Sequence, residues 1–251
     1  MKLFNVFAGI LLGTLTATAV IADEEKKSTE AASKNDSAVE KVDAAKSGGF
    51  TYRPPMRGAP AARIGGGTRG IGDQTLTLVV LAPDHTGLTT KEQPTLYWYA
   101  SEPVPAKLEV TLINDENIDP ELEEVVATPG NAGIQSIDLE KAGAKLETGK
   151  EYRWFVSVIA DPGQRSNDIV ASGTIQRIDP SDELKGEIAG ADENTLAGVY
   201  AKEGVWYDAI DALNRMIEKS PGNKELQQQR TALLEQVGLQ GAADFTRANT
   251  K

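Results

Sequence analysis

A change in hydrophobic period near Pro180 constrains the fold of this chain more than any other feature of its 251 residues. From Thr75 to Asp179 apolar and polar residues alternate between clusters of Pro, Gly, Asn and Asp, a pattern typical of half-buried strands joined by turns. After Pro180 the apolar residues recur at helical spacing. The predicted fold class is mainly β with α: a β-sandwich domain over residues 73–180 and a helical segment over residues 181–240.

The β region is predicted to hold seven short strands and no helical run. The predicted strands are Leu76–Ala82, Thr95–Ser101, Lys107–Ile113, Leu122–Ala127, Ile134–Leu139, Tyr152–Ala160 and Ile169–Ile178. This pattern favours an antiparallel sandwich of the immunoglobulin or fibronectin III type. Alternate residues from Tyr152 to Val158 share one strand face, which we expect to form core. Residues Leu146–Trp154, where a Leu and a Gly precede Tyr152, resemble the start of a strand in fibronectin type III and related immunoglobulin-like domains.

The helical segment has the spacing of one tetratricopeptide repeat. The matching positions are Leu196, Ala197, Tyr200, Gly204, Trp206, Ala209, Leu213 and Pro221. A third helix is predicted over Asn223–Leu239. Because a single repeat leaves an apolar face uncovered, we expect this hairpin to pack against the sandwich or against a partner. Residues 241–251 are predicted to be a flexible tail.

Residues 1–22 have the anatomy of a secretory signal peptide. Lys2 is followed by a small, apolar run, and Val20-Ile21-Ala22 precedes Asp23, so cleavage is expected after Ala22. A membrane anchor is the alternative, but the run falls just short of the about 20 residues that span a bilayer. The mature protein is predicted to be periplasmic or extracellular, with no stable membrane span after cleavage.

Two segments of biased composition follow. Residues 23–47 are rich in Glu, Lys, Asp, Ser and Ala and are predicted to be a disordered charged tether. Residues 48–72 contain four arginines and no carboxylate among Pro and Gly, and are predicted to be an extended basic arm. Two interpretations of the arm stay open: a solvated spacer, or a segment that docks on the acidic body or on an anionic partner.

The composition excludes several kinds of chemistry. Without cysteine the chain has no disulfides, thiolate metal sites or cysteine nucleophile. Its net charge of −11 becomes −12 when the signal peptide removes Lys2, so non-specific binding of nucleic acid is not expected. We predict no cofactor, no metal and no catalytic residue.

Two motifs that suggest catalysis or phosphate binding have plainer explanations. His85, the single histidine, lies in a loop bounded by Pro and Gly, where an exposed side chain explains it better than a Ser-His-Asp triad. Gly65–Gly70 could cradle an anion, but no Lys-Ser or Lys-Thr follows it. A flexible hinge is the favoured interpretation of that glycine run.

The spacing of Asp115, Asn117 and Asp119 resembles the beginning of a calcium loop. Pro120 and Val126 stand where an EF-hand needs Gly and Glu, so that motif is excluded. An acidic hairpin loop is favoured, and a looser calcium site near Asp115–Asp119 stays open.

Five motifs spread from about Ala59 to Leu239 resemble the bacterial family catalogued as domain of unknown function 928. They are Gly65–Gly70, Pro94–Tyr99, Leu146–Trp154, Ser172–Arg177 and Gly204–Ala209. Members often carry a cysteine just after the Thr-Arg-Gly motif, where this chain has Ile71-Gly72-Asp73. A redox role of that cysteine therefore does not apply here, and the resemblance implies no established activity.

The predicted interaction residues are Arg69, Tyr97, Tyr99, Trp206 and Tyr207. Along a strand Tyr97 and Tyr99 face one way and Trp98 the other. The immunoglobulin resemblance favours Trp98 in the core, which leaves the two tyrosines as an aromatic platform for sugar or peptide. An ordinary cross-strand pair is the plainer alternative.

We expect a non-enzymatic exported adaptor or scaffold that binds another envelope or surface protein through the sandwich and the helical hairpin. The alternative is a carbohydrate-binding module for cell-wall or extracellular polysaccharide. A third class, an undetected hydrolase, has no carboxylate pair in an apolar setting to support it. A solvent-open Tyr97/Tyr99 shelf would favour the polysaccharide alternative, and an apolar groove beside Trp206 and Tyr207 would favour the adaptor.

Overall fold

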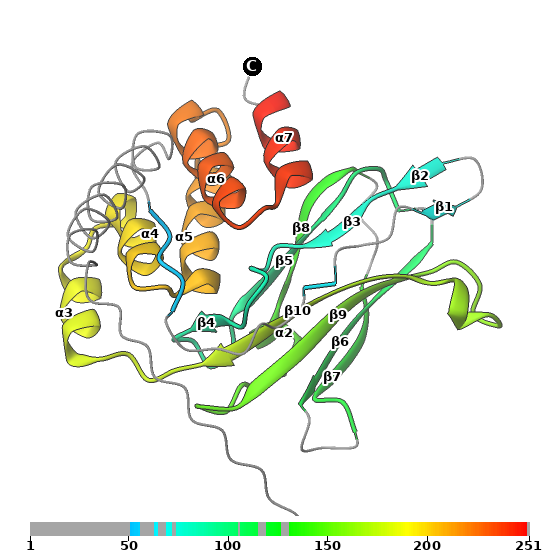
Figure 1. Ribbon diagram of the computed structural model, residues 1–251, viewed down its shortest axis with the longest axis horizontal. Helices are drawn as coiled ribbons and strands as arrows, with labels where there is room; N and C mark the ends of the chain where they lie inside the picture. Colours follow the sequence, from blue (N-terminus) through cyan, green and yellow to red (C-terminus); the bar gives the residue numbers. More distant parts are fainter. Residues whose placement is uncertain are drawn as a thin grey trace, which may run out of the picture. The chain divides into compact units, whose positions relative to one another are not determined.

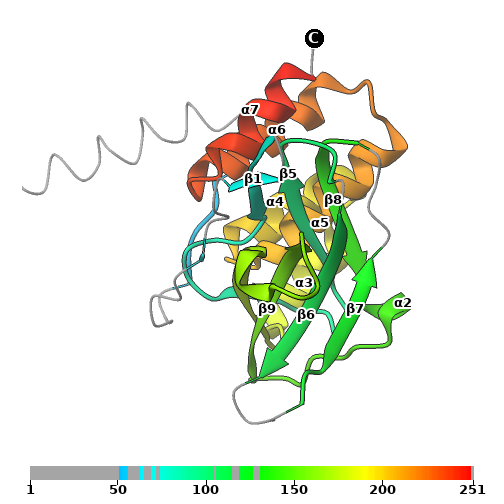
Figure 2. The same cartoon turned by 90° about the vertical axis from the view of Figure 1, so that its right-hand side faces the viewer.

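The computed structural model describes residues 51–55, 63–64, 69–71, 74–104, 106–114, 119–126 and 131–249. All of them belong to one compact unit, Val42–Lys251. The predicted signal peptide and charged tether lie outside the described residues, as does most of the basic arm. The described fold is β with α, as predicted. A three-stranded sheet packs on a larger sheet, and the C-terminal helices gather beside both; of these, α5 (Trp206–Lys219) contacts a strand of each sheet (Figures 1 and 2).

The larger sheet has the strand order β4-β10-β9-β6-β7. Its strands are β4 (Gly87–Thr89), β6 (Lys107–Asn114), β7 (Leu122–Val126), β9 (Glu151–Ile159) and β10 (Ile169–Arg177). All neighbours are antiparallel except β4, which runs parallel to β10. The prediction of a wholly antiparallel architecture is therefore wrong at this edge. β4 has only three residues, too few for an alternation to reveal a strand in the sequence.

The smaller antiparallel sheet has the order β3-β5-β8. Its strands are β3 (Leu78–Val80), β5 (Thr95–Ala100) and β8 (Gly133–Asp138), and a ribbon of β1 (Arg69–Ile71) and β2 (Gln74–Leu76) precedes them. β3 packs on β10 of the larger sheet, where a Cβ on Gly173 would lie only 2.6 Å from the Cβ of Ala82. A glycine is therefore needed at this position of β10, where the chain from Val80 to Ala82 approaches it closely.

Most predicted strands are confirmed to within one or two residues of their ends. The first, Leu76–Ala82, is divided between β2 and β3 at Thr77. A short helix, α2 (Leu139–Ala142), interrupts the region that was predicted to lack helix. Its N-cap is Asp138, whose side chain accepts a hydrogen bond from the Glu140 N–H. Because Asp138 also fits the alternating pattern of the preceding strand, the sequence pattern did not reveal it as the start of a helix.

The core forms where the sequence places it on β9. Tyr152, Trp154, Val156 and Val158 are each at most 1 % exposed. Because these residues alternate along the strand, one face of β9 is fully buried. The predicted core face of this strand is confirmed.

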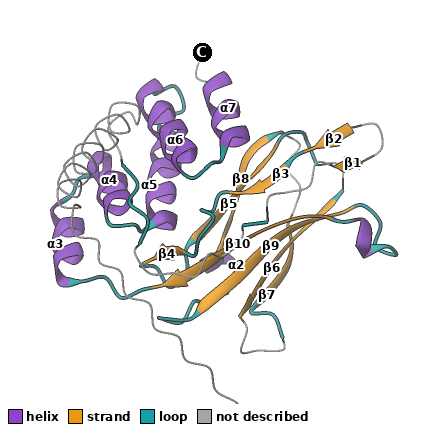
Figure 3. Ribbon diagram, in the orientation of Figure 1, coloured by secondary structure: helices purple, strands orange, loops and turns teal. Residues whose placement is uncertain are grey.

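After β10 the described chain is helical, and the helices gather on one side of the strands (Figure 3). The helices are α3 (Asp182–Gly190), α4 (Glu193–Lys202), α5 (Trp206–Lys219), α6 (Lys224–Gln236) and α7 (Gln240–Ala248). Side chains of Ser181, Asp192 and Asn223 accept backbone N–H groups at the starts of α3, α4 and α6. α4 packs on α5, and α6 packs on α7.

α7 corrects the prediction that residues 241–251 form a flexible tail. Gly238 has a φ of +72°, a left-handed conformation that glycine adopts readily and that reverses the chain after α6. Ala242 and Ala243 are then buried. Two alanines carry too weak an apolar signal to predict this packing from sequence. None of the helices in the described ranges has the length and apolar character needed to cross a membrane.

Residues 180–251 expressed alone are expected to form a poorly ordered peptide. In the whole chain α5 buries Trp206 and Tyr207, and α5 contacts β4 and β5, so a fragment without strands exposes that face to water. Far-UV circular dichroism with a thermal melt measures the outcome. Strong helical signal that melts cooperatively would show that the helices are stable without the strands.

Candidate functional site

The start of α5 joins the helices to the strands through two buried aromatic side chains. The indole N–H of Trp206 donates to the carbonyl of Leu81 at 2.8 Å. The hydroxyl of Tyr207 donates to the carbonyl of Thr174 at 2.9 Å and accepts from the indole N–H of Trp154 at 2.9 Å. Both α5 side chains are at most 1 % exposed. The Gly-Val-Trp-Tyr-Asp-Ala motif is therefore an internal joint, and its two rings are not accessible to a partner.

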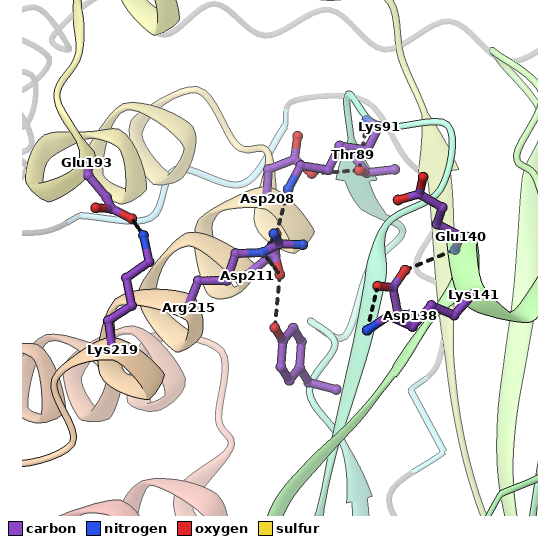
Figure 4. A network of polar contacts seen from close by, with 11 residues as sticks. Thr89, Lys91, Asp138, Glu140, Lys141, Glu193, Asp208, Asp211, Arg215 and Lys219 are labelled. Carbon is purple, nitrogen blue, oxygen red and sulfur yellow. Dashed lines mark hydrogen bonds and ion pairs between the residues drawn. The ribbon is translucent and has the colours of Figure 1, made fainter.

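Asp208 adds a buried carboxylate to this joint (Figure 4). It accepts hydrogen bonds from the hydroxyl of Thr89 at 2.6 Å, from the hydroxyl of Thr90 at 2.5 Å and from the N–H of Thr90 at 2.9 Å. Burial raises the pKa of Asp208, although nearby Lys91 and the three hydrogen bonds act in the opposite direction. The carboxylate fixes the loop after β4 to α5.

Asp211 lies about one turn further along α5 and has different partners. It accepts from Lys91 Nζ at 2.5 Å, from the hydroxyl of Tyr97 at 2.9 Å and from Arg215 Nε at 3.0 Å. Burial alone would raise the pKa of Asp211, but Lys91, Arg215 and Tyr97 outweigh burial and hold that pKa below its ordinary value. Figure 4 shows Lys91 and Arg215 converging on this carboxylate. Asp211 is therefore a charged anchor shared by a helix, a strand and a loop.

A cavity of about 240 Å³ opens beside these carboxylates and is lined partly by Lys91, Tyr200, Asp211 and Arg215. Asp208 and Asp211 are enclosed, and the two cations are engaged by Asp211. The polar groups here already satisfy one another, which is the pattern of a structural joint rather than of a binding site.

Part of the basic arm is seated against the helices, and we call this place the arm seat. Figure 1 shows the segment Thr51–Pro55 in blue, running beside α4 and α5. The buried ring of Tyr52 meets Trp206 edge-on with centroids 5.1 Å apart and stacks on His85 at 5.9 Å. Its hydroxyl is hydrogen-bonded to His85 Nε2 at 2.9 Å, and its N–H donates to Gln236 Oε1 at 2.8 Å. The arm thus inserts an aromatic side chain between the helices and the loop that carries His85.

Backbone contacts hold the next residue of the arm. The N–H of Arg53 donates to the carbonyl of Ala201 at 3.0 Å. Gly204, whose φ is +73°, lies beneath the arm, and a Cβ there would be 2.7 Å from the carbonyl oxygen of Arg53. Gly204 is therefore required both for the turn after α4 and for the close approach of the arm.

Arg63 provides a second attachment of the arm. Its Nη1 group donates to the carbonyl of Ala82 at 2.8 Å and to the carbonyl of Val237 at 3.1 Å. Burial lowers the pKa of Arg63, with Asp84 opposing that effect. The described part of the arm is therefore docked on the body, through carbonyl contacts and the Tyr52 ring rather than through ion pairs.

A second cavity, of about 470 Å³, lies between the arm, α4 and α6. Its lining includes Arg53 from the arm, Gly198 and Lys202 from α4, and Gln229 from α6. Its walls thus come from three separate parts of the chain.

The structure buries both tyrosines of the predicted aromatic platform. Tyr97 is 4 % exposed with its hydroxyl on Asp211, and Tyr99 is 7 % exposed, with its ring centroid 5.4 Å from that of Phe245 on α7. The helices cover the face of β5 that carries these tyrosines, so no solvent-open shelf exists there. The prediction that Trp98 is in the core is confirmed by its exposure of 0 %.

The remaining residues that the sequence suggested for binding or catalysis do not form a site in the described part of the structure. The backbone of Arg69 forms part of β1, but its side chain lies outside the described residues. Asp115 and Asn117 also lie outside them, and Asp119 is exposed. Within the described ranges no group of three or more His, Cys, Asp and Glu side chains could hold a metal. His85 is only partly exposed and serves the arm seat, so the prediction of a freely exposed loop histidine needs correction.

Sequence reasoning missed Tyr52, Asp208 and Asp211. The two aspartates interrupt the apolar face of α5, and polar residues at such positions are a signal that buried partners are present. Tyr52 is an aromatic residue in a segment otherwise rich in Pro, Gly and Arg. Phe50 stands two positions before it, and aromatic residues in such a segment were the available sign that the arm docks.

Comparisons with known proteins give one informative match. The family described as "Domain of Unknown Function (DUF928)" matches residues 64–246. No curated protein matches the chain. Among solved structures, a multi-domain immunophilin from Arabidopsis thaliana matches at 8% sequence identity over 77% of this chain and 99% of that chain, with a TM-score of 0.18. A TM-score this low carries no argument about fold or function.

Proposed function

The chain belongs to the DUF928 family, and we propose that it works as an exported, non-enzymatic adaptor that binds another envelope protein. The arm seat carries this proposal. There, the helices and the loop that carries His85 together hold an extended segment, Thr51–Pro55, by burying one ring and by hydrogen-bonding to its backbone. Burial of an anchor side chain together with main-chain hydrogen bonds is how proteins commonly recognise extended peptides. The binding face proposed is the one formed by the arm, α4 and α6.

A finer description of the fold accompanies this proposal. We interpret the two facing sheets as an immunoglobulin-like sandwich and α4–α5 as a tetratricopeptide-like hairpin. Support comes from the antiparallel β6-β9-β10 pairing around Trp154 and from Ala197 and Ala209, both fully buried. Such small residues let paired helices approach closely.

The proposed location is the periplasm or the cell exterior, on the strength of the leader Met1–Ala22. The non-enzymatic assignment is supported by Asp208 and Asp211, the two buried carboxylates of the joint, since each is engaged by structural partners. The polysaccharide-binding alternative loses its main support, because it depended on an open shelf of Tyr97 and Tyr99 and both are buried.

Photo-crosslinking in cells tests the adaptor proposal. A benzoylphenylalanine residue replaces Lys202 on the proposed face, or Glu123 on the exposed edge strand β7 as the matched control. We expect position 202 to crosslink to one envelope protein, position 123 to yield no such product, and the recovered chain to begin at Asp23. A folded chain that crosslinks at neither position, or equally at both, would contradict a partner on the helical face.

A further inference from the structure

The arm seat holds the segment Thr51–Pro55 in the way that a peptide-binding site holds its ligand. Within this segment Tyr52 is the one buried side chain, and the other four are exposed or half-buried. The N–H of Tyr52 donates to Gln236 Oε1, and the N–H of Arg53 donates to the carbonyl of Ala201. One buried anchor ring combined with main-chain hydrogen bonds is the usual pattern of extended-peptide recognition.

The surface under the arm fits a backbone and one tyrosine. A Cβ on Gly204 would lie 2.7 Å from the carbonyl oxygen of Arg53, so glycine leaves room for the main chain of the arm. The Tyr52 ring meets Trp206 edge-on at 5.1 Å, and its hydroxyl is hydrogen-bonded to His85 Nε2 at 2.9 Å. The seat therefore has a place for an aromatic ring and a polar group for its hydroxyl.

The body beneath the arm is held together by contacts that do not include the arm. The indole N–H of Trp206 donates to the carbonyl of Leu81, and the hydroxyl of Tyr207 donates to the carbonyl of Thr174. A short segment with few buried contacts is the kind of element that opens without global unfolding. Release of Thr51–Pro55 would therefore uncover a tyrosine site whose framework is already formed.

Arg63 keeps the arm close to its seat. It is bonded to the carbonyls of Ala82 and Val237, a short way along the chain from Tyr52. A short tether gives a segment an effective concentration on the order of millimolar at its binding site. A free segment of the same chemistry must compete with that concentration, so the seated arm weakens its binding.

We propose that Thr51–Pro55 is an autoinhibitory occupant of the arm seat, and that the partner displaces it with an extended segment of its own that carries a tyrosine. The partner's tyrosine takes the place of Tyr52 against Trp206, with its hydroxyl at His85. Its backbone N–H groups bond to the two acceptors that now serve the arm. This inference rests on the proposed adaptor function and names the chemistry of its partner and the regulation of its site.

The test uses the isotope-labelled full chain with Tyr52→Ala, which empties the anchor site. The peptide acetyl-Thr-Tyr-Arg-Pro-Pro-amide, with the sequence of residues 51–55, is titrated while NMR signals are followed. We expect shifts concentrated at Gly204, the indole N–H of Trp206 and the side chain of Gln236. The wild type should bind the peptide at least about tenfold more weakly, because its own arm leaves the seat open in fewer than about one molecule in ten.

Peptide and chain variants check the individual contacts. In the Tyr52→Ala chain, a peptide with Phe in place of Tyr should bind several-fold more weakly, and a peptide with Ala there should not bind measurably. Adding Gln236→Leu should weaken the tyrosine peptide by about threefold to tenfold, since it removes one acceptor. Thr51→Ala is the matched control in the arm: it changes an exposed side chain, keeps Tyr52, and should bind the peptide as weakly as the wild type.

Hydrogen exchange of the wild type measures release of the arm without any substitution. The Arg53 N–H should have a protection factor at least about tenfold below that of the Leu213 N–H within α5, because the arm opens alone. Equal protection would mean that the arm leaves only when the whole chain unfolds, which rejects the proposal. Retained dispersion of the NMR spectrum verifies the fold of each variant.

Three further results would overturn the proposal: no shifts at the seat of a folded Tyr52→Ala chain, equal affinity for the tyrosine and alanine peptides, or equal affinity of the wild type and Tyr52→Ala. A wild-type dimer in sedimentation that Tyr52→Ala dissociates would assign the seat to the arm of a second copy and reject a partner segment. Crosslinking from position 202 in cells combined with any of these results would leave the adaptor function standing. Peptide binding without a crosslinked partner would support the tyrosine seat and reject the adaptor function.

Discussion

Replacing Trp206 with alanine is expected to lower the free energy of unfolding by about 3 to 5 kcal/mol, the usual cost of emptying a large aromatic site in a core. The side chain is fully buried, and its ring contacts Tyr52 of the arm. Its removal also takes away the indole N–H that donates to the carbonyl of Leu81. Chemical denaturation followed by circular dichroism measures the change.

Two comparisons isolate the origin of the effect. Trp206→Phe keeps an aromatic ring in the site but loses the hydrogen bond, so it should cost about 1 to 3 kcal/mol, less than alanine. Val125→Ala on β7, where the side chain is 58% exposed, should change the free energy of unfolding by less than about 0.5 kcal/mol. If Trp206→Ala unfolded at the same denaturant concentration as Val125→Ala, α5 would not pack on the strands as described.

The long strands and the helices after Pro180 were predictable because each has its own local period. On β9 the alternation from Tyr152 to Val158 is long enough to define which face is buried. Trp98 was also placed correctly: alternation puts it on the face opposite Tyr97 and Tyr99, and the immunoglobulin resemblance indicated that its face is the core. Local pattern thus determined which residues form each long strand and which way their side chains face.

The arm seat and the covering of β5 depend on contacts between distant parts of the chain. Tyr52 meets Trp206, and no periodicity links a tyrosine in a Pro- and Gly-rich segment to a helix so far along the sequence. The two tyrosines of β5 have the spacing of a solvent-facing pair, and only the placement of α5 and α7 buries them. The aromatic residues that the sequence predicted for binding are therefore buried, and the candidate interaction surface is instead formed by the arm and its neighbouring helices.

Replacing Asp211 with alanine is expected to lower the free energy of unfolding by about 2 to 4 kcal/mol. The change removes the acceptor shared by Lys91, Tyr97 and Arg215 and leaves the Tyr97 hydroxyl buried without a partner. The cost stays below that of breaking a fully buried ion pair, because the Lys91 and Arg215 side chains are 37% and 57% exposed and can turn to water. Asp182→Ala, a fully exposed carboxylate paired with Lys185, is the control and should cost almost nothing.

The pH dependence of Asp211→Asn tests whether the carboxylate is charged. The folded pKa of Asp211 lies below its ordinary value, so its stabilising contribution is present above the unfolded pKa of about 3.9 and is lost as the pH falls through the folded pKa. Asp208, whose pKa is raised, has the opposite sign: its contribution decreases as the pH rises from the unfolded to the folded pKa. Asp208 is present in both proteins, so its effect cancels in the comparison. The difference in unfolding free energy between the wild type and Asp211→Asn should therefore be largest near neutral pH and shrink below about pH 4. A difference that stays constant from neutral to strongly acidic pH would mean that Asp211 does not hold α5 to the strands as an ionised group.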